Sequence, residues 1–266
     1  VALANKESMV VGGAVITREA ARSGARIIPV DSEHSGVFQC LGRERRRVRK
    51  VVLTASGGPF LETPLKELAR KTVEEALRHP RWVMGRKVTV DSATLMNKGL
   101  ELIEARWLFD LEPDRLGVLI HPQSAVHALV EMKDGSVLAQ LGATDMRLPI
   151  QYALTWPARR DTGLPALDLA RLGRLEFREV DERRYPLFTL ARLDLAAGES
   201  LPVALNAANE VAVAAFLEKR IPFSGLHGVV AGVVEGHRVR PAGTVEEILD
   251  IDREARREAR RLVPQR

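Results

Sequence analysis

The sequence predicts an α/β fold in successive parts: alternating strands and helices, then a small sheet, then a bundle of helices. Near the N-terminus, a strand-like, a helical and a second strand-like segment follow one another, which is typical of a parallel sheet. In the middle of the chain, two β-type segments flank a Lys-Asp-Gly turn signal, as in a hairpin. The last part contains four segments with helical periodicity, which pack best as a small bundle.

The composition is that of an ordinary globular protein. The chain has 266 residues, of which 45% are hydrophobic and 28% charged, so it can bury a substantial core, and we expect two domains. A single cysteine, Cys40, rules out an internal disulfide and favours a reducing compartment. The apolar runs are too short to span a membrane, and we expect no membrane partner. Since Val1 already reads as part of a strand, we expect the chain to begin inside a domain whose earlier part is missing.

The net charge is +5, and much of the excess lies in two arginine-rich runs, residues 43–50 and 253–266. Such runs occur in proteins that bind nucleic acids. However, aromatic residues make up only 5% of the chain, glutamates interrupt the arginines, and no known nucleic-acid-binding motif is present. A solvated, arginine-rich surface is the simpler interpretation, and we expect no nucleic-acid partner.

The first predicted elements are a strand at residues 1–4, a helix, and a strand at residues 25–30. Asp31 and Glu33 follow the second strand directly, at the end of a parallel strand where such sheets bind ligands. Two carboxylates two residues apart converge only in a turn, and on these residues alone capping of the next helix is the favoured interpretation.

A strand over residues 48–56 is predicted to run into Gly57-Gly58. A glycine pair allows backbone N–H groups to approach a phosphate closely, and it also suits any tight turn. Short helices are expected to begin at Thr63-Pro64 and at Thr72, where Thr72 and Glu75 match a capping box.

Residues 79–85 read HPRWVMG and show neither helical nor strand periodicity. Trp82 and Met84 on such a loop need an apolar surface to cover. The loop either packs on its own domain or acts as a lid that closes over a substrate and excludes water. A strand over residues 87–90 is predicted to follow the loop.

Residues 91–106 predict the helix around which the candidate site is organised. Asp91 or Ser92 can cap this helix. Ser92, Asn97 and Lys98 would then lie near its N-terminal end, where free N–H groups and the helix dipole favour an anion.

Two stripes of this helix have different characters. One holds Asn97, Glu101 and Glu104, whereas the neighbouring stripe is apolar and is expected to face the core: Met96, Leu100, Ile103 and Trp107. The acidic stripe is either a solvated face with i,i+4 charge pairs or the binding site of a ligand with a phosphate and a metal-chelating part.

The middle of the chain predicts strands over residues 117–130 and 135–142, joined as a hairpin, and then a helix that ends by Trp156. His121 and His127 are six residues apart, which is poor spacing for one metal ion, so we interpret them as structural or as facing a substrate. Residues 158–184 contain strand-like pieces and resemble a linker. The final helices are predicted over residues 185–197, 203–219, 225–236 and 245–263, the last opened by a capping box at Thr244.

Taken together, these patterns favour a site with hard oxygen ligands. Its carboxylates would come from Asp31, Glu33 and Glu101, with Glu104 nearby, and its phosphate donors from Ser56, Ser92, Asn97 and Lys98. Without a cysteine or a paired histidine, such a set favours Mg²⁺ or Mn²⁺ over Zn²⁺.

Seven motifs give the chain a close resemblance to the 1-deoxy-D-xylulose 5-phosphate reductoisomerase family of the methylerythritol phosphate route to isoprenoids. They are ALANKES (2–8), PVDSEH (29–34), SGGPF (56–60), HPRWVMGRKVTVDSATLMNKGLELIEARWLF (79–109), HPQSAVH (121–127), GSVLAQLGATDMR (135–147) and LNAANE (205–210). They occur in order and cover essentially the whole chain.

The resemblance implies a four-part organisation. Residues 1–31 would be the C-terminal part of a doubly wound NADPH-binding domain, 32–157 an α+β catalytic domain with a small mixed sheet, 158–184 a linker, and 185–266 a helical domain. The Gly-rich loop that binds the NADPH pyrophosphate in this family does not occur in the sequence. We therefore expect the chain to retain only part of the NADPH site.

The resemblance also implies roles for individual residues. Catalysis would involve Lys6, Glu33 and His79, and the metal would be held by Asp31, Glu33 and Glu101. The substrate would contact Lys6, Ser32, Glu33, Ser56, His79, Trp82, Ser92, Asn97, Lys98 and Glu101. NADPH would contact Asn5, Glu7, Met84, Gly85 and Met146.

The implied activity is a metal-dependent rearrangement of 1-deoxy-D-xylulose 5-phosphate followed by reduction with NADPH to 2-C-methyl-D-erythritol 4-phosphate. The implied cofactors are NADPH and Mg²⁺ or Mn²⁺, with Co²⁺ as a further option, and the implied assembly is a cytoplasmic homodimer. A phosphosugar isomerase or aldolase without a redox step is the alternative enzyme class, and a nucleic-acid-binding module is the alternative outside the enzymes.

Overall fold

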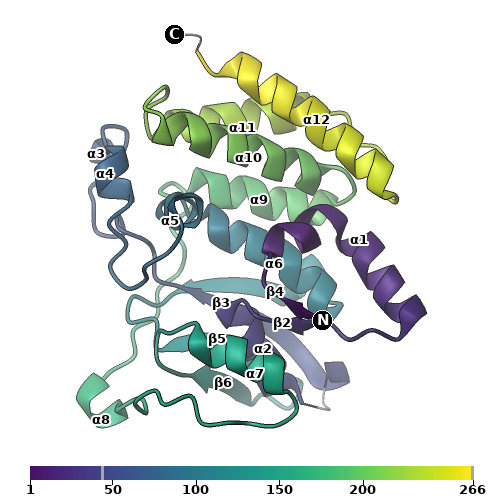
Figure 1. The fold of residues 1–266 in the computed structure, drawn as a ribbon. Helices are drawn as coiled ribbons and strands as arrows, with labels where there is room; N and C mark the ends of the chain where they lie inside the picture. Colours follow the sequence, from purple (N-terminus) through teal and green to yellow (C-terminus); the bar gives the residue numbers. More distant parts are fainter. Residues whose placement is uncertain (43–44, 265–266) are drawn as a thin grey trace. The chain divides into compact units, whose positions relative to one another are not determined.

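The structure, a computed structural model, describes residues 1–42 and 45–264, and its chain divides into two units (Figure 1). Unit 1 comprises Val1–Lys6, Thr17–Ser56 and Ala105–Val180. Unit 2 comprises Glu7–Ile16, Gly57–Glu104 and Asp181–Arg266. The predicted division at residues 31, 157 and 184 stays a prediction. Arg43, Glu44, Gln265 and Arg266, which belong to the two arginine-rich runs, lie outside the described residues.

Unit 1 is built on a four-stranded mixed sheet with the order β4-β3-β5-β6. Its strands are β3 (Val48–Ala55), β4 (Leu116–Ile120), β5 (Val126–Met132) and β6 (Val137–Leu141). β3 runs parallel to β4 and antiparallel to β5. The predicted hairpin is confirmed, since β5 and β6 pair antiparallel across a turn in which Gly135 has a φ of +90°.

The predicted strand over residues 117–130 is in fact two strands. They are separated because residues 121–125 leave the sheet around the fully buried ring of His121. Its Nε2 accepts a hydrogen bond from the Ala125 N–H at 3.1 Å, and its Nδ1 lies 2.8 Å from the Glu176 carbonyl oxygen. His121 is therefore a structural residue, as one of the two interpretations proposed.

The N-terminal strand–helix–strand alternation is confirmed. β1 (Ala2–Leu3) and β2 (Ile28–Pro29) are parallel, and α1 (Lys6–Ser23) connects them. α2 (Ser32–Leu41) packs on β3, β5 and β6, and α7 (Arg147–Thr155) lies beside α2 (Figure 1). Gly36 permits this packing, because a Cβ there would be 3.3 Å from the Ala128 side chain.

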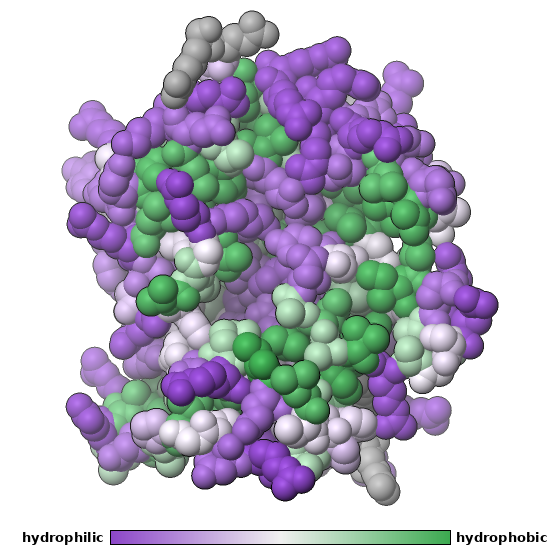
Figure 2. Space-filling view, viewed as in Figure 1, coloured by the Kyte–Doolittle hydropathy of each residue, from purple (hydrophilic) through white to green (hydrophobic). Residues whose placement is uncertain are grey.

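Four helices of unit 2 form the predicted bundle: α9 (Pro186–Ala197), α10 (Leu201–Leu217), α11 (Gly225–Gly236) and α12 (Val245–Leu262). α10 is apolar around most of its circumference and packs against the other three. α12 is amphipathic, and its outer side is hydrophilic in Figure 2. The capping boxes at Thr72 and Thr244 are both present. Among the described residues, no helix has the length and apolar character needed to cross a bilayer.

Residues 87–90 form a helix and not the predicted strand. They belong to α5 (Arg86–Ala93), which α6 (Met96–Phe109) follows. The β-branched run Val88-Thr89-Val90 favours a strand by propensity, but Thr89 Oγ1 donates to the Gly85 carbonyl and the Lys87–Asp91 pair bridges one helical turn. Consequently neither Asp91 nor Ser92 caps α6, which begins only at Met96.

The remaining elements are short: α3 (Leu65–Leu68), α4 (Val73–Ala76), α8 (Leu169–Leu172) and the 3₁₀ turns η1 (Arg45–Arg47) and η2 (Pro113–Arg115). The helix expected to begin at Thr63-Pro64 is α3, and Pro64 is its N-cap. The strand-like piece around residue 178 contributes only an isolated bridge between Arg178 and Ile120.

Asp194 of α9 predicts a pH-dependent stability of the bundle. The residue is 3% exposed, and its Oδ2 has no hydrogen-bond partner among the described residues. Burial raises the pKa of Asp194 from 3.8 to about 7. Between these two values the folded state binds more protons than the unfolded chain, so the residue lowers the free energy of unfolding as the pH rises through this window. Asp194→Asn should stabilise the protein above neutral pH by roughly 2–4 kcal/mol, with little gain in mild acid.

Urea unfolding at several pH values measures this difference. Asp114→Asn, at an exposed position, is the control and should show no pH-dependent difference from the wild type. A constant offset between Asp194→Asn and the wild type over the whole range would contradict the prediction.

Candidate functional site

Unit 1 gathers four of the predicted site residues at the N-terminal end of α2. Asp31 is the N-cap and accepts a hydrogen bond from the Ser32 N–H at 3.0 Å, so the capping interpretation is correct. Ser32 Oγ donates to Glu33 Oε2 at 2.6 Å, and Lys6 Nζ lies 2.5 Å from Asp31 Oδ2. Capping does not exclude a binding role, because the cap fixes both carboxylates in one turn beside a lysine.

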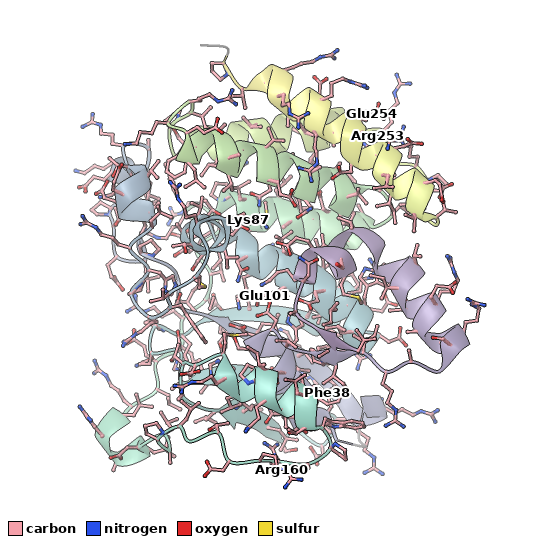
Figure 3. The ribbon with its side chains drawn as sticks, viewed as in Figure 1. Phe38, Lys87, Glu101, Arg160, Arg253 and Glu254 are labelled. Atoms are coloured by element: carbon pink, nitrogen blue, oxygen red, sulfur yellow. The ribbon has the colours of Figure 1, made fainter. Side chains whose placement is uncertain are left out.

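Unit 2 gathers three more predicted residues in the first two turns of α6. Asn97 Nδ2 donates to Glu101 Oε1 at 2.5 Å, and Lys98 Nζ lies 2.5 Å from Glu101 Oε2. Lys98 is 3% exposed and Glu101 is 1% exposed. Figure 3 labels Glu101 on α6. The interpretation of this stripe as a solvated face is therefore wrong. Burying a carboxylate costs several kcal/mol unless charged partners offset it, and Lys98 and Asn97 supply that compensation.

The apolar stripe of α6 is buried as expected at Met96, Leu100 and Ile103, whereas Trp107 is only partly buried. Glu104 on the acidic stripe is also 1% exposed. α6 is thus enclosed on its acidic side as well as on its apolar side.

A buried ionic network that the sequence did not reveal holds α5 in place. Asp91 is fully buried; its Oδ2 lies 2.9 Å from Lys87 Nζ, and its Oδ1 accepts a hydrogen bond from Asn209 Nδ2 at 2.9 Å. Lys87 also pairs with Glu7 Oε1 at 2.8 Å (Figure 3 labels Lys87). Together the carboxylates of Asp91 and Glu7 raise the pKa of Lys87 although burial alone would lower it. The i,i+4 spacing of Lys87 and Asp91 was a usable signal, but the predicted strand concealed it.

The Gly57-Gly58 turn packs directly on the end of α5. Gly58 has a φ of +69°, and a Cβ there would be 2.5 Å from the Ser92 carbonyl oxygen. Tyr185 donates its hydroxyl hydrogen to the Gly57 carbonyl at 2.8 Å. Close packing therefore requires glycine at position 58, and it keeps this turn beside Ser92. The fourth predicted phosphate donor, Ser56, belongs to unit 1.

Residues 79–85 form the predicted irregular loop. His79 Nδ1 accepts hydrogen bonds from the N–H groups of Arg81 at 3.1 Å and Trp82 at 2.8 Å. Burial lowers the pKa of His79 to about 4, so near neutral pH the imidazole is uncharged and carries its proton on Nε2. Trp82 and Met84 are partly buried, whereas Val83 is exposed.

The structure divides the predicted NADPH contacts between the two units. Asn5 and Met146 belong to unit 1, whereas Glu7, Met84 and Gly85 belong to unit 2. Gly85 is the N-cap of α5, and Glu7 takes part in the Lys87 network. The predicted set is therefore not gathered within either unit.

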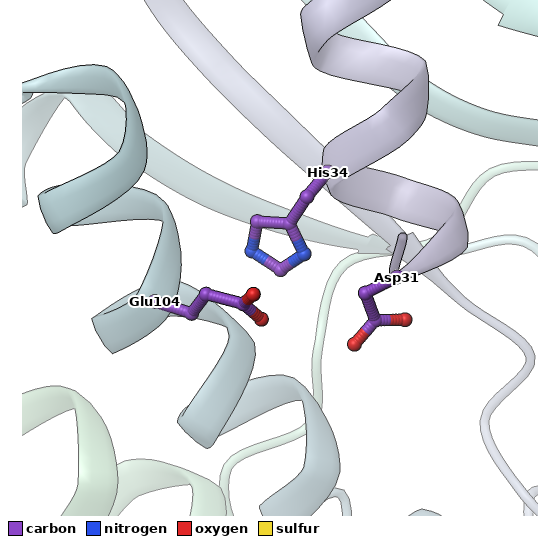
Figure 4. Close-up of side chains that lie close together, drawn as sticks. All are labelled: Asp31, His34 and Glu104. Carbon is purple, nitrogen blue, oxygen red and sulfur yellow. The ribbon is translucent and has the colours of Figure 1, made fainter. Parts of the chain in front are cut away.

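Sequence reasoning assigned no role to His34. The residue is fully buried, and its ring stacks on Phe109 with centroids 6.1 Å apart and planes inclined by 12°. Figure 4 draws His34 and Asp31 at the start of α2, and Glu104 on α6. The three-residue spacing in the PVDSEH motif, which places His34 one turn after the N-cap, was the available signal.

Two family models match the chain. Residues 27–109 match the 1-deoxy-D-xylulose 5-phosphate reductoisomerase C-terminal domain, and residues 141–258 match the DXP reductoisomerase C-terminal domain. Among curated proteins, the chain is 52% identical over 262 residues to 1-deoxy-D-xylulose 5-phosphate reductoisomerase of Pseudomonas aeruginosa (strain UCBPP-PA14), covering 96% of this chain and 66% of that protein. It is 50% identical over 264 residues to the Chlorobaculum tepidum protein of the same name, covering 99% of this chain and 69% of that protein. The chain thus spans about two thirds of the length of these relatives.

Solved structures are similar over the same extent. A DOX-P reductoisomerase in complex with NADPH, fosmidomycin and magnesium superposes with a TM-score of 0.94 at 41% identity, covering 98% of this chain and 69% of that one. The Zymomonas mobilis 1-deoxy-D-xylulose 5-phosphate reductoisomerase in complex with NADPH gives a TM-score of 0.93 at 44% identity, covering 98% of this chain and 68% of that one.

Removal of the cation beside Asp91 should destabilise unit 2. Lys87→Met leaves a fully buried carboxylate without its ion pair and should lower the free energy of unfolding by about 3 kcal/mol. Chemical unfolding followed by circular dichroism measures the change. Lys71→Met removes a lysine whose partner, Glu75, is solvent-accessible, and it should have a much smaller effect. Equal losses for the two variants would show that the burial of Asp91 does not matter.

Proposed function

Since this chain belongs to the 1-deoxy-D-xylulose 5-phosphate reductoisomerase family, we propose that it carries the catalytic part of that activity. The proposed reaction is the metal-dependent rearrangement of 1-deoxy-D-xylulose 5-phosphate and its NADPH-dependent reduction to 2-C-methyl-D-erythritol 4-phosphate, in isoprenoid biosynthesis. Two acidic clusters carry the proposal. The first is Asp31 with Glu33, beside Lys6, and the second is the buried Glu101, beside Lys98. A cytoplasmic location fits the single cysteine.

The donor chemistry of these residues fits a divalent cation. We assign the ion to Asp31, Glu33 and Glu101, whose carboxylate oxygens suit Mg²⁺ or Mn²⁺, with Co²⁺ as a further option. In the described part of the chain, a second candidate group combines Asp31 with His34 and Glu104. Because an imidazole is a poorer ligand for Mg²⁺ than a carboxylate, we assign His34 and Glu104 a supporting role around the ion.

α6 carries residues of both units. The boundary between the units falls between Glu104 and Ala105, inside this single helix. Its last turn contacts α2 through the stacking of Phe109 on His34 within unit 1. With a rise of about 1.5 Å per residue, Glu104 stands about 7.5 Å and Glu101 about 12 Å along the helix from Phe109.

Each remaining predicted residue has a physical task in this proposal. Ser56, Ser92, Asn97 and Lys98 bind the substrate phosphate, and Lys6 and Ser32 bind its hydroxyl groups. A bound divalent ion supplies polarisation of the substrate oxygens and stabilises the negative charge that develops on them. His79, neutral and protonated on Nε2, can donate a hydrogen bond to the substrate, while Trp82 helps the loop exclude water.

We further propose that NADPH delivers the hydride from the side of the site formed by Asn5, Glu7, Met84, Gly85 and Met146. The activity of the intact protein tests the whole proposal. Oxidation of NADPH should require both 1-deoxy-D-xylulose 5-phosphate and a divalent metal ion. Conversion of the substrate without NADPH would instead identify a phosphosugar isomerase or aldolase and would refute the reductoisomerase assignment.

Loss of one metal ligand should be visible without any turnover. Glu101→Gln removes one of three carboxylates and should weaken Mn²⁺ binding by about 100-fold or more, as measured by electron paramagnetic resonance of free Mn²⁺. Glu112→Gln, at an exposed position after α6, is the matched control and should bind Mn²⁺ like the wild type. Unchanged affinity in a folded Glu101→Gln variant would remove Glu101 from the metal site.

We propose that the chain forms a homodimer through the free edge of β6. This strand ends the sheet order β4-β3-β5-β6, and it exposes Val137 at 55% and Leu138 at 42%. An exposed apolar edge strand readily pairs with another strand. Leu138→Lys should therefore shift the protein to a monomer in size-exclusion chromatography with light scattering. Leu193→Lys, a similar change on the exposed side of α9, should leave the dimer intact, and a Leu138→Lys dimer would place the interface elsewhere.

A further inference from the structure

Unit 2 contains a cavity of about 290 Å³ to which the proposed reaction assigns no role. It is lined by residues of α3, of the N-terminal turn of α9 and of the N-terminal turn of α11, and we call it the α3–α9–α11 pocket. Figure 1 labels these three helices. None of the residues assigned above to substrate, metal or NADPH lines this pocket. Its volume is close to the lower end of the range of small-molecule sites, about 300–1,000 Å³.

The interior of the pocket is apolar. Leu187 and Leu226, which are 2% and 1% exposed, form its deep part, and Leu65 and Leu68 of α3 form its outer wall. Phe223 completes the interior and is held by edge-to-face contacts with Phe60 and Phe216. A rigid aromatic and aliphatic surface of this kind favours a hydrocarbon chain or ring.

The polar residues of the pocket are cationic or neutral. Arg183, Arg184 and His227 line it, and no aspartate or glutamate is among its lining residues. Arg184 is fixed in place because its Nη1 donates to the carbonyls of Phe60 at 2.9 Å and Thr63 at 2.6 Å. The side chain of Arg183 is largely exposed, and its Nε makes a long contact of 3.4 Å with Asp181 Oδ1, so it can turn towards an anion at the mouth.

The two helix ends add to this positive potential. The N-caps of α9 and α11 are Tyr185 and Ser224, and neither makes a side-chain capping hydrogen bond. Pro186 has no N–H, and the N–H groups of Gly225 and Leu226 donate to the carbonyls of Pro222 and Phe223. The positive dipole end of each helix, and not a free N–H group, therefore favours negative charge beside the arginines.

We propose that the α3–α9–α11 pocket binds a small amphipathic anion, a short hydrocarbon chain or ring that carries one carboxylate or phosphate. The hydrocarbon part occupies the surface of Leu187, Leu226 and Phe223, and the anionic head lies at Arg183 and Arg184. Charge complementarity distinguishes this ligand from a neutral apolar one.

Isothermal titration calorimetry with octanoate, octyl phosphate and octanamide tests the proposal. At least one of the two anions should bind in the millimolar range or tighter, and octanamide should bind about tenfold more weakly than that anion. A preference between octanoate and octyl phosphate identifies the head group. Absence of binding by both anions, or equal binding of octanamide, overturns the proposal.

Variants locate the binding to this pocket. Ala69→Trp fills the mouth from an exposed position and should weaken binding by about tenfold or more, and Arg183→Ala should weaken it by about threefold. Lys66→Ala removes an exposed cation of α3 that does not line the pocket, and it is the matched control. Thermal unfolding verifies that each variant is folded. Wild-type affinity in folded Ala69→Trp, or an equal loss in Lys66→Ala, overturns the proposal.

Discussion

A buried carboxylate remains ionised only beside a cation or several hydrogen-bond donors, and at Asp91 this constraint governs how α5 is held in unit 2. Asp91 is fully buried, and its partners are Lys87 on its own helix, α5, and Asn209 on α10. Lys87 in turn pairs with Glu7 on α1. A shift of α5 relative to α10 would remove a hydrogen bond from this buried charge. The position of α5 is therefore determined by electrostatics as much as by apolar packing.

The segment between α5 and α6 follows from that position. Thr94 ends α5, and Leu95 adopts a φ of +59°, which is uncommon for a residue with a branched side chain. Leu95 is 3% exposed, so apolar burial compensates for this conformation. The reversal brings the last turn of α5 close in sequence and space to the first turn of α6. This connection between the two helices carries three predicted phosphate-binding residues. Ser92 lies at the end of α5, and Asn97 and Lys98 lie at the start of α6.

The same principle explains why the acidic stripe of α6 is suited to function. Glu101 is compensated by Lys98 and Asn97, groups that also suit a phosphate-bearing ligand. Asp31 and Glu33 are compensated by Lys6, by the Ser32 hydroxyl and by the start of α2. Both acidic clusters thus combine carboxylates with a lysine, as the proposed metal and substrate contacts require, and neither cluster is an exposed surface feature.

The sequence by itself determined the features that depend on neighbours along the chain: the β5–β6 hairpin at Gly135, the four helices of the bundle, the capping boxes at Thr72 and Thr244, and the motifs that identify the family. Only the tertiary structure decided that residues 87–90 are helical, that Glu101 is buried, and that His34 and Asn209 have partners far away in sequence. The reason is physical. Turns and caps are stabilised by contacts within a few residues, whereas burial and ion pairing depend on which distant helices pack together, and local periodicity carries no information about that choice.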